Sequence, residues 1–164
     1  MQREMRAAAA TTSVSPPSQE AEQQAEKYLT FRVGIDAFAV PFSRVREIMS
    51  MQEITAAPES PAFVKGTINL RGKIVPVVDL RLKFGLPGRE HKPRTCMVVV
   101  QIEEPTAGKL IVGIIVDTVV EVLTLRAGDI RNGAARVGGK IKTLLDLDRL
   151  LSTEEMHSLV AVCY

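Results

Sequence analysis

Apolar and polar residues alternate over much of the chain, a pattern that predicts mainly β-strands. The alternation in residues 27–42 is interrupted once, by a Gly-Ile-Asp turn, which is typical of a β-hairpin. Further apolar runs cover residues 66–79, 95–104 and 109–125. At least eight short strands, with only short helices between them, favour an architecture of small β-barrels.

Residues 43–49, which read SRVREIM, depart from strict alternation. Val45, Ile48 and Met49 have helical spacing, and Ser43 has the side chain of an N-cap. These features predict a short helix directly after the first hairpin.

Capping residues predict two further helices. Asp79 precedes a helix of one or two turns that stops at Gly85. Ser152 and Glu155 form the capping box of a final helix. Pro76 lies inside the strand before Asp79, and because proline has no backbone N–H, that strand is expected to be an edge strand or to bulge there.

Residues 66–85 and 133–151 align without a gap at a shift of 67 positions (133 − 66). Both read as strand, glycine turn, strand and Asp-capped short helix. The identical pairs are Gly66/Gly133, Gly72/Gly139, Lys73/Lys140, Ile74/Ile141, Asp79/Asp146 and Leu80/Leu147. Either the chain contains a duplication, or the match reflects features that any such hairpin shares. A duplication would place each copy in its own five-stranded barrel and leave an apolar groove between the barrels, of the kind that accepts a partner helix.

The glycine turn differs between the two copies at one position. Arg71 stands at the first glycine turn, where the second copy has Gly138. An arginine at a turn is ordinarily solvated. A more specific hypothesis is that Arg71 pairs with Glu47 and so fixes a planar guanidinium at the mouth of the groove.

The composition indicates a packed core and argues against nucleic-acid binding. The chain of 164 residues is 46% hydrophobic but only 4% aromatic, and its net charge of +2 comes from charges scattered singly. Two cysteines make no disulfide framework, and no His/Cys spacing suggests a metal, which fits a reduced cytoplasmic setting. The sequence has neither an apolar run of about 18 residues, as a membrane span needs, nor the apolar region of a secretory signal.

The residues that ordinarily carry out catalysis lack a suitable setting. His91 lies in a polar loop and His157 in the last helix, away from any nucleophile motif. Asp79 and Asp146 suit helix capping better than acid–base chemistry. No glycine-rich phosphate loop occurs. We therefore expect no enzymatic activity, no cofactor and no metal site.

The chain divides into a leader and one folded unit. Residues 1–26 are rich in Ala, Ser, Thr, Gln and Pro and show no sustained apolar period, which predicts a flexible N-terminal leader. Residues 27–160 are expected to form a single domain that contains both hairpin copies.

Four stretches together resemble the CheW family of bacterial chemotaxis coupling proteins: SRVREIM, PAFVKGTINLRGKIVPVVDLRLKFG, GIIVDTVVEVLTL and LLDLDRLLSTEEM. The resemblance runs from about Tyr28 to Leu159 and implies a CheW-like fold of two SH3-like five-stranded β-barrel subdomains. It further implies a non-catalytic adaptor between the cytoplasmic tip of methyl-accepting chemoreceptors and the regulatory domain of the histidine kinase CheA. Such a protein would be cytoplasmic and would reach the inner membrane through receptor arrays.

The resemblance also implies a set of receptor-binding residues. Glu47 and the arginine of the Asn-Leu-Arg-Gly motif, Arg71, correspond to positions that contribute to receptor coupling, and Val45 corresponds to a receptor contact. Cys96 and Val98, on the strand after the polar loop, are expected to line the same groove.

The chain departs from the family near Ile130–Gly133. Here RAGDIRNGAARV leads almost directly into the second hairpin, whereas family members usually carry a longer segment. The difference predicts a truncated loop or a shortened strand and affects one kinase-facing contact. Two other functions stay open: a scaffold of another chemosensory system such as pilus-based motility, and a barrel that binds single-stranded nucleic acid through a basic groove and stacking aromatics.

Overall fold

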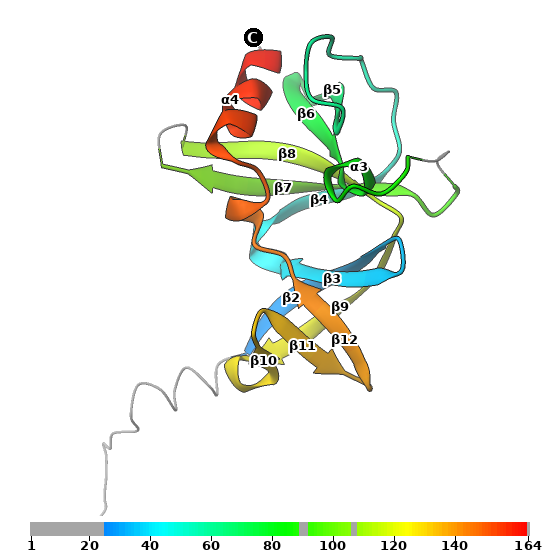
Figure 1. Ribbon diagram of the computed structural model, residues 1–164, viewed down its shortest axis with the longest axis vertical. Helices are drawn as coiled ribbons and strands as arrows, with labels where there is room; N and C mark the ends of the chain where they lie inside the picture. Colours follow the sequence, from blue (N-terminus) through cyan, green and yellow to red (C-terminus); the bar gives the residue numbers. More distant parts are fainter. Residues whose placement is uncertain (1–24, 89–91, 106–107, 164) are drawn as a thin grey trace, which may run out of the picture.

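The computed structural model describes residues 25–88, 92–105 and 108–163. Their strands form two sheets, and in the view of Figure 1 the five-stranded sheet and α4 lie above the six-stranded sheet. The predicted mainly-β fold with two β subdomains is confirmed. The boundaries predicted for the leader and the domain stay predictions, because most of the leader lies outside the described residues.

The six-stranded sheet has the order β10, β11, β12, β3, β2, β9, and the five-stranded sheet has the order β4, β7, β8, β6, β5. The strands of the first are β2 (Ala25–Val33), β3 (Asp36–Pro41), β9 (Thr118–Arg126), β10 (Ile130–Arg131), β11 (Ala134–Val137) and β12 (Lys140–Leu144). Those of the second are β4 (Val45–Ser50), β5 (Val64–Leu70), β6 (Lys73–Asp79), β7 (Cys96–Glu104) and β8 (Gly108–Val116). The helices and 3₁₀ turns of the described part are η1 (Phe42–Arg44), α3 (Leu80–Lys83), η2 (Ala127–Asp129), η3 (Leu147–Arg149) and α4 (Thr153–Val162). Five strands were expected in each subdomain, and β10 gives one sheet a sixth.

Both sheets are built on one plan. In each, the second strand of an antiparallel hairpin (β2–β3 or β7–β8) pairs in parallel with the second strand of a Gly-Lys-Ile hairpin (β11–β12 or β5–β6). The repeat in the sequence therefore has a structural counterpart. The strand that follows each first hairpin crosses to the opposite sheet, so that β4 pairs with β7 and β9 pairs with β2.

The helix predicted for residues 43–49 is wrong. Only Phe42–Arg44 form a helical turn, which Ser43 does not cap, and β4 begins at Val45. A β-bulge after Val45 makes Arg46 an extra residue opposite β7. Because a bulge shifts the alternation of a strand by one position, the apolar residues of this strand have the spacing of a helix.

The second crossing strand, β9, has the same irregularity. Its pairing with β2 skips one residue between Val119 and Glu121. The matching segments read Val45-Arg46-Glu47 in β4 and Val119-Val120-Glu121 in β9. The duplication therefore extends beyond the two hairpins to the strands that cross between the sheets.

Local capping signals located the other helices correctly. Asp79 Oδ1 accepts the backbone N–H of Arg81 at 2.9 Å at the start of α3. Ser152 and Glu155 form the predicted capping box of α4, with hydrogen bonds of 2.8 and 3.1 Å between side chain and backbone. These caps need only neighbouring residues, which is why the sequence reveals them.

Pro76 lies in β6, which has a neighbour on each side, so the edge-strand expectation is wrong. Pairing with β8 covers only Val77–Asp79, and Thr67 of β5 opposes Pro76. The missing N–H of Pro76 therefore removes no hydrogen bond from the parallel ladder. The bulge of this hairpin lies in β5, between Val64 and Gly66.

The segment before the second hairpin is short, as predicted. The turn Ala127–Asp129 leads into β10, which has two residues, and Asn132 and Gly133 reverse the chain into β11. Whether this segment is shorter than in other family members stays a prediction.

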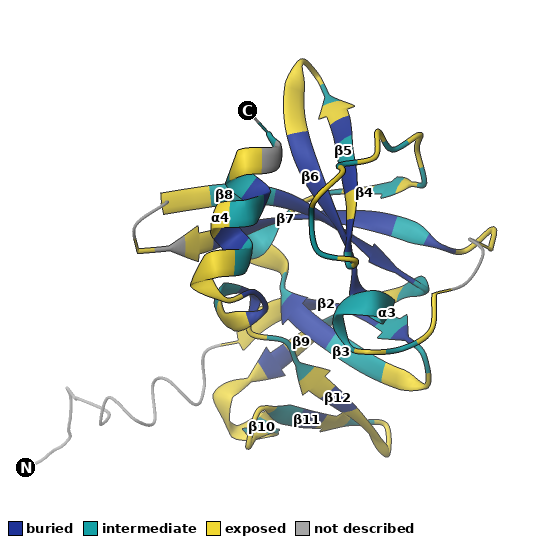
Figure 2. Cartoon of the chain, turned by 45° about the horizontal axis from the view of Figure 1, so that its top comes forward, coloured by how far each residue is buried: buried dark blue, intermediate teal, exposed yellow. Residues whose placement is uncertain are grey.

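The main hydrophobic core lies between the two sheets. Buried stretches of β3, β7 and β8 run through the interior in Figure 2. The cluster includes Leu29, Phe31, Val33 and Val40 from one sheet and Val98, Val100, Ile102, Val112, Ile114 and Val116 from the other. Side chains fill the centre of the interface between the subdomains, and the apolar groove expected along its rim stays a prediction.

A bidentate ion pair fastens the first crossing. Arg44, just before β4, donates to both carboxylate oxygens of Asp148 in η3, at 2.9 and 2.8 Å. Asp148 also accepts the backbone N–H of Glu103 at 2.9 Å, and Arg44 donates to the carbonyl of Gln101 at 3.0 Å. The hydrogen bonds from Arg44, with that from Glu103, lower the pKa of Asp148 below its ordinary value, although partial burial opposes the shift.

The stabilisation by Asp148 should depend on pH. Because its pKa is lowered in the folded state, its contribution is complete above the pKa of the unfolded chain, about 4, and is lost as pH falls through the lower folded-state value. Asp148→Asn should therefore lower the free energy of unfolding at neutral pH and by progressively less in acid. Urea unfolding over a pH series measures this, with Arg44→Gln expected to behave alike. A difference that does not change with pH would contradict the assignment.

Gly66 and Gly133 are identical in the repeat but differ in what surrounds them. A Cβ at Gly66 would lie 1.9 Å from the backbone oxygen of Thr55, whereas nothing lies within 4 Å of one at Gly133. We expect Gly66→Ala to cost about 3 kcal/mol or more of unfolding free energy. Gly133→Ala should cost only about 1 kcal/mol, because its φ is +74° but the space is open. Equal losses in urea unfolding would show that the close approach to Thr55 does not matter.

Candidate protein-binding site

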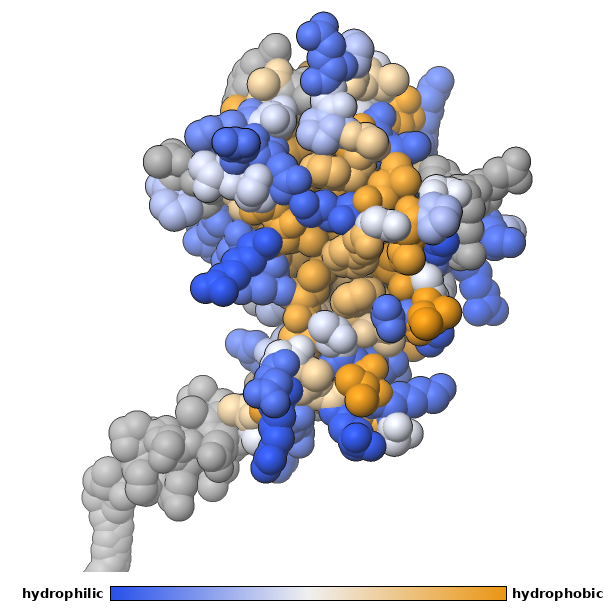
Figure 3. Space-filling model, viewed as in Figure 1, coloured by the Kyte–Doolittle hydropathy of each residue, from blue (hydrophilic) through white to orange (hydrophobic). Residues whose placement is uncertain are grey.

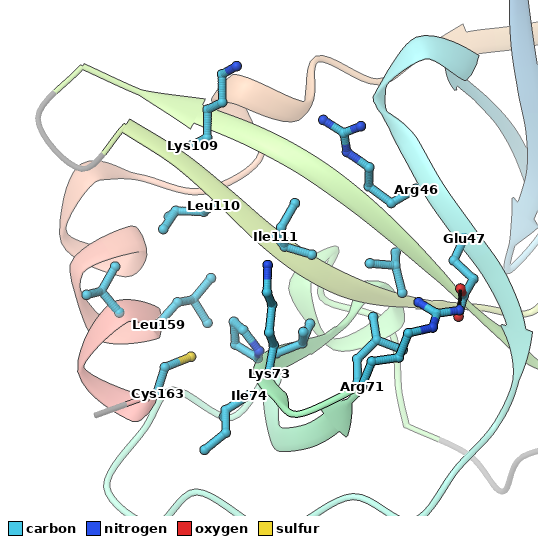
Figure 4. Close-up of a pocket in the computed structure, with 15 residues that line it drawn as sticks. Arg46, Glu47, Arg71, Lys73, Ile74, Lys109, Leu110, Ile111, Leu159 and Cys163 are labelled. Carbon is cyan, nitrogen blue, oxygen red and sulfur yellow. Dashed lines mark hydrogen bonds and ion pairs between the residues drawn. The ribbon is translucent and has the colours of Figure 1, made fainter.

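A cavity of about 870 Å³ opens on the five-stranded subdomain. β4, the β5–β6 hairpin, β7, β8 and α4 all contribute to its walls (Figure 4). Its apolar lining includes Leu70, Ile74, Val75, Val99, Ile111 and Leu159. We call this cavity the α4 groove, because residues of that helix form part of its wall.

The lining of the α4 groove combines buried and exposed apolar residues. Val75 and Val99 are buried in the sheet, and Leu159 is a buried residue of α4. Ile74, in contrast, is 54% exposed. In Figure 3 hydrophobic side chains extend across the middle of the face shown, from the five-stranded sheet toward its junction with the six-stranded sheet, with hydrophilic ones around them. An exposed apolar surface with a polar rim is typical of a site where another protein docks.

Cationic side chains dominate the polar lining of the groove. Arg46, Arg71, Lys73 and Lys109 line it together with a single carboxylate, Glu47. Figure 4 shows that these side chains come from four places in the fold: β4, the β5–β6 turn, β6 and β8. The groove therefore favours a partner that presents carboxylates around an apolar stripe.

Arg71 holds a backbone conformation that suits glycine. Its φ is +52°, and Gly72 follows at +84°; the second copy has Gly138 at +58° and Gly139 at +78°. Asn69 Oδ1 accepts the N–H of Gly72 at 2.9 Å and helps to hold the turn. A non-glycine residue in the left-handed region costs on the order of 1 kcal/mol. The arginine at this turn is therefore kept at some expense of stability.

The Arg71 guanidinium forms an ion pair with the carboxylate of Glu47. The hypothesis that these two side chains meet is confirmed, although Glu47 comes from a strand and not from the helix that the sequence suggested. The pair joins the edge strand β4 to the β5–β6 turn across the sheet. Arg71 is 74% exposed at its side chain, so the guanidinium faces the groove mouth and stays accessible.

Three of the five predicted receptor-binding residues lie elsewhere. Val98 is fully buried in the core between the sheets, so its predicted place along a groove is wrong. Cys96 and Val45 pack against the same core, and burial raises the pKa of the Cys96 thiol. Val98 opposes Ile114 in the sheet, and the side chains of this pair point toward the six-stranded sheet.

Several residues of the α4 groove had not been predicted as site residues. Lys73 and Ile74 belong to the Gly-Lys-Ile hairpin, and the repeat draws attention to them because the same Lys-Ile pair recurs at Lys140 and Ile141. Ile111, Leu159 and the partly buried Cys163 reach the groove from β8 and α4 through tertiary packing, for which the sequence carries no local signal.

The other candidate chemical groups have structural places. Asp79 and Asp146 cap α3 and η3, as predicted. His157 is exposed on α4, and His91 lies outside the described residues. Across 25–88, 92–105 and 108–163, no group of three or more His, Cys, Asp and Glu side chains is arranged to hold a metal ion. None of the helices described in the structure is long and apolar enough to cross a membrane.

Comparison with known proteins places this geometry in a family. The sequence pattern of the CheW-like domain matches residues 27–155, which include both sheets and the start of α4. The chain belongs to the CheW family. The predicted resemblance is thereby confirmed.

Curated relatives and a solved structure agree with this assignment. A chemotaxis protein CheW of Klebsiella aerogenes is 34% identical over 149 residues, which cover 82% of this chain and 87% of that protein. A chemotaxis protein CheW of Rhizobium meliloti is 32% identical over 144 residues, or 79% of this chain and 90% of that protein. The crystal structure of the scaffolding protein TtCheW from Thermoanaerobacter tengcongensis superposes with a TM-score of 0.71 at 27% identity, over 80% of this chain and 96% of that one. The chain is thus a chemotaxis scaffold protein by family.

The contrast between Val98 and Ile74 can be measured as stability. Val98→Ala removes two buried methyl groups from the shared core and should lower the free energy of unfolding by about 2 kcal/mol. Ile74→Ala, at an exposed site on the same sheet, should change it by less than about 0.5 kcal/mol. Denaturant unfolding measures both. A small loss of unfolding free energy for Val98→Ala would show that Val98 is not a core residue and would leave it as a candidate surface contact.

Proposed function

We propose that this protein is a non-catalytic cytoplasmic adaptor that couples methyl-accepting chemoreceptors to the histidine kinase CheA. Membership of the CheW family and relatives named as chemotaxis proteins support a scaffold of this kind. The observation that carries the proposal is the Glu47–Arg71 ion pair at the mouth of the α4 groove. Both residues hold positions where the family resemblance implies receptor coupling.

The chemistry of the α4 groove suits the helical hairpin tip of a receptor. An amphipathic helix docks by placing an apolar face into an apolar groove. The lining offers exposed Ile74 together with the partly buried Leu70 and Ile111 for such contacts. Lys73 and Lys109 then attract carboxylates along the polar edge of the helix and exclude a basic one.

The strained turn at Arg71 supports a role in binding. The second copy shows that glycine satisfies this turn, since Gly138 and Gly139 adopt the same left-handed conformations. An arginine there gains only an exposed ion pair, worth about 0–1 kcal/mol, which does not clearly offset the strain. We infer that the guanidinium is retained because its planar donors, oriented by Glu47, contact the receptor.

Signalling follows from binding both partners at once. A coupler that binds two receptor states with different affinity shifts the kinase equilibrium by that difference. Individual contacts of modest affinity suffice, because a repeating array multiplies them by avidity. The kinase contact belongs to the regulatory domain of CheA, and the residues of this chain that make it are not assigned.

A scaffold in another chemosensory system, such as pilus-based motility, would use the same groove. Pull-down with one kinase rather than another separates the two systems. A nucleic-acid-binding barrel finds no support, because the groove has no aromatic lining for stacking. Phe31, Phe38 and Phe84 instead pack against one another at the core, with the Phe31–Phe38 and Phe38–Phe84 ring centroids 6.0 and 5.1 Å apart.

Charge reversal at Arg71 tests the proposed receptor contact. Arg71→Glu should weaken association with a receptor signalling fragment by about tenfold or more, because it opposes Glu47 and repels the carboxylates of the partner. Arg71→Gly should weaken it as well, yet leave stability unchanged or slightly higher, since glycine relieves the strain. Co-purification with the receptor fragment and a CheA regulatory domain, followed by titration, provides the measurement.

Lys140→Glu is the matched control, because Lys140 is the counterpart of Lys73 in the second hairpin and is exposed outside the groove. It should leave receptor binding unchanged. The proposal fails if Arg71→Gly binds receptor normally, or if Lys140→Glu weakens binding as much as Arg71→Glu does.

A further inference from the structure

A second ion pair fastens the other crossing. Asp117 lies between β8 and β9, and its carboxylate accepts a hydrogen bond from Arg81 of α3 at 2.8 Å. The same carboxylate oxygen accepts the backbone N–H of Gly34, in the β2–β3 turn, at 2.7 Å. The side chains of Arg81 and Asp117 are only 15% and 11% exposed. Each crossing between the sheets is thus held by an arginine–carboxylate pair, and Arg44 of the first crossing also lies 3.7 Å from Glu103.

The two ion pairs occupy equivalent places in the duplicated plan. β12 runs parallel to β3, and β6 runs parallel to β8. Because parallel strands end at the same edge of a sheet, the helix after β12 lies beside the crossing after β3, and the helix after β6 lies beside the crossing after β8. The helix residues concerned, Arg81 and Asp148, are 67 positions apart (148 − 81), which is the shift of the repeat.

The polarity of the two pairs is opposite. At the first crossing the arginine is on the crossing, Arg44, and the carboxylate is on the hairpin–helix unit, Asp148. At the second crossing the carboxylate is on the crossing, Asp117, and the arginine is on the unit, Arg81. Stability alone does not require this inversion, because two pairs of the same polarity would attract equally.

An inverted pair distinguishes two ways of assembling the chain. The two hairpin–helix units share the Gly-Lys-Ile turn and the capping aspartate, so β6 could pair with β3, and β12 with β8. That exchanged arrangement would bring Arg44 against Arg81, and Asp117 against Asp148. We infer that the opposite polarity of these ion pairs directs each duplicated hairpin to its own sheet by making the exchanged topology repulsive at both crossings.

Burial makes this discrimination effective. Like charges in half-buried positions are costly, because solvent screens them less than at the surface. In the native arrangement backbone N–H groups of Gly34 and Glu103 also solvate the two carboxylates. The first unit follows β4 directly in the chain, so β5–β6 is the unit that reaches β3 first during folding, and a mechanism that rejects this pairing has a clear use.

Charge-swapped variants of the full chain test the inference. One variant combines Arg44→Asp with Asp148→Arg, and a second combines Arg81→Asp with Asp117→Arg. Each keeps opposite charges at both crossings but gives the two crossings the same polarity, so the exchanged arrangement is no longer repulsive. A third variant carries all four substitutions and restores the inversion with every sign reversed.

After refolding from urea, amide resonances report any second species, and inter-strand NOEs identify it as one in which β6 lies beside β3. We expect this species to rise about fivefold or more in each double variant, because both like-charge contacts of the exchanged arrangement become attractive. It should return to the wild-type level in the fourfold variant, even though that variant loses the most backbone hydrogen bonds. A second species that instead grows with loss of stability, or is equal in all proteins, would overturn the inference.

The neutral variant Arg81→Gln with Asp117→Asn decides the case if the charge-swapped proteins do not fold. It keeps the shape of the Asp117 side chain and the acceptor for the N–H of Gly34, while glutamine shortens the side chain at position 81. It also removes the repulsion at both crossings of the exchanged arrangement, since Arg44 and Asp148 then face neutral groups. A rise in the exchanged species supports the inference, and its absence refutes it.

Discussion

The two sheets share one core because each supplies an edge strand to the other. β4 follows the β2–β3 hairpin of one sheet and pairs with β7 of the other. β9 follows the β7–β8 hairpin and pairs with β2 of the first sheet. These crossings hold the sheets against each other, and the cluster around Phe31 and Ile114 fills the space between them. Neither half can then lose its partner without losing a strand and exposing that core. Any protein that binds this chain without unfolding it must therefore use an outer surface.

The duplicated plan leaves the two halves with different surfaces. In the five-stranded half, α4 packs beside the repeated hairpin, and the α4 groove lies between them. The same hairpin position in the six-stranded half has Gly138 in place of Arg71 and no counterpart of α4 beside it in the described part. Duplication thus supplies the frame, and the sequence differences between the copies give only one of them the α4 groove.

Local signals allowed much of the fold to be predicted from the sequence. Turns and caps depend on neighbouring residues, so the hairpins, the Asp79 cap and the capping box at Ser152 follow from the chain directly. The Glu47–Arg71 contact could be predicted because the second copy has glycine where the first has Arg71, which drew attention to that arginine. The duplication thus revealed part of the site as well as the plan of the fold.

Other features depend on tertiary pairing that the sequence does not encode locally. The bulge at Arg46 gives the apolar residues of β4 the spacing of a helix, so the sequence pattern did not predict a strand there. Val98 lies in a continuous apolar run, which gives no alternation from which to decide which face of the strand it occupies. The exchange of β4 and β9 between sheets joins residues far apart in the chain, and for the same reason the groove beneath α4 could not be located in advance.

The central claim is that a receptor docks in the α4 groove, outside a core that stays closed. Amide shift mapping and hydrogen exchange of the labelled full-length protein, with and without a receptor signalling fragment, test it most directly. We predict the largest shifts at Glu47, Arg71, Ile74 and Ile111 and in α4, with the protection of β2, β7 and β8 undiminished. Shifts concentrated on β11 and β12, or a loss of protection between the sheets on binding, would contradict the account.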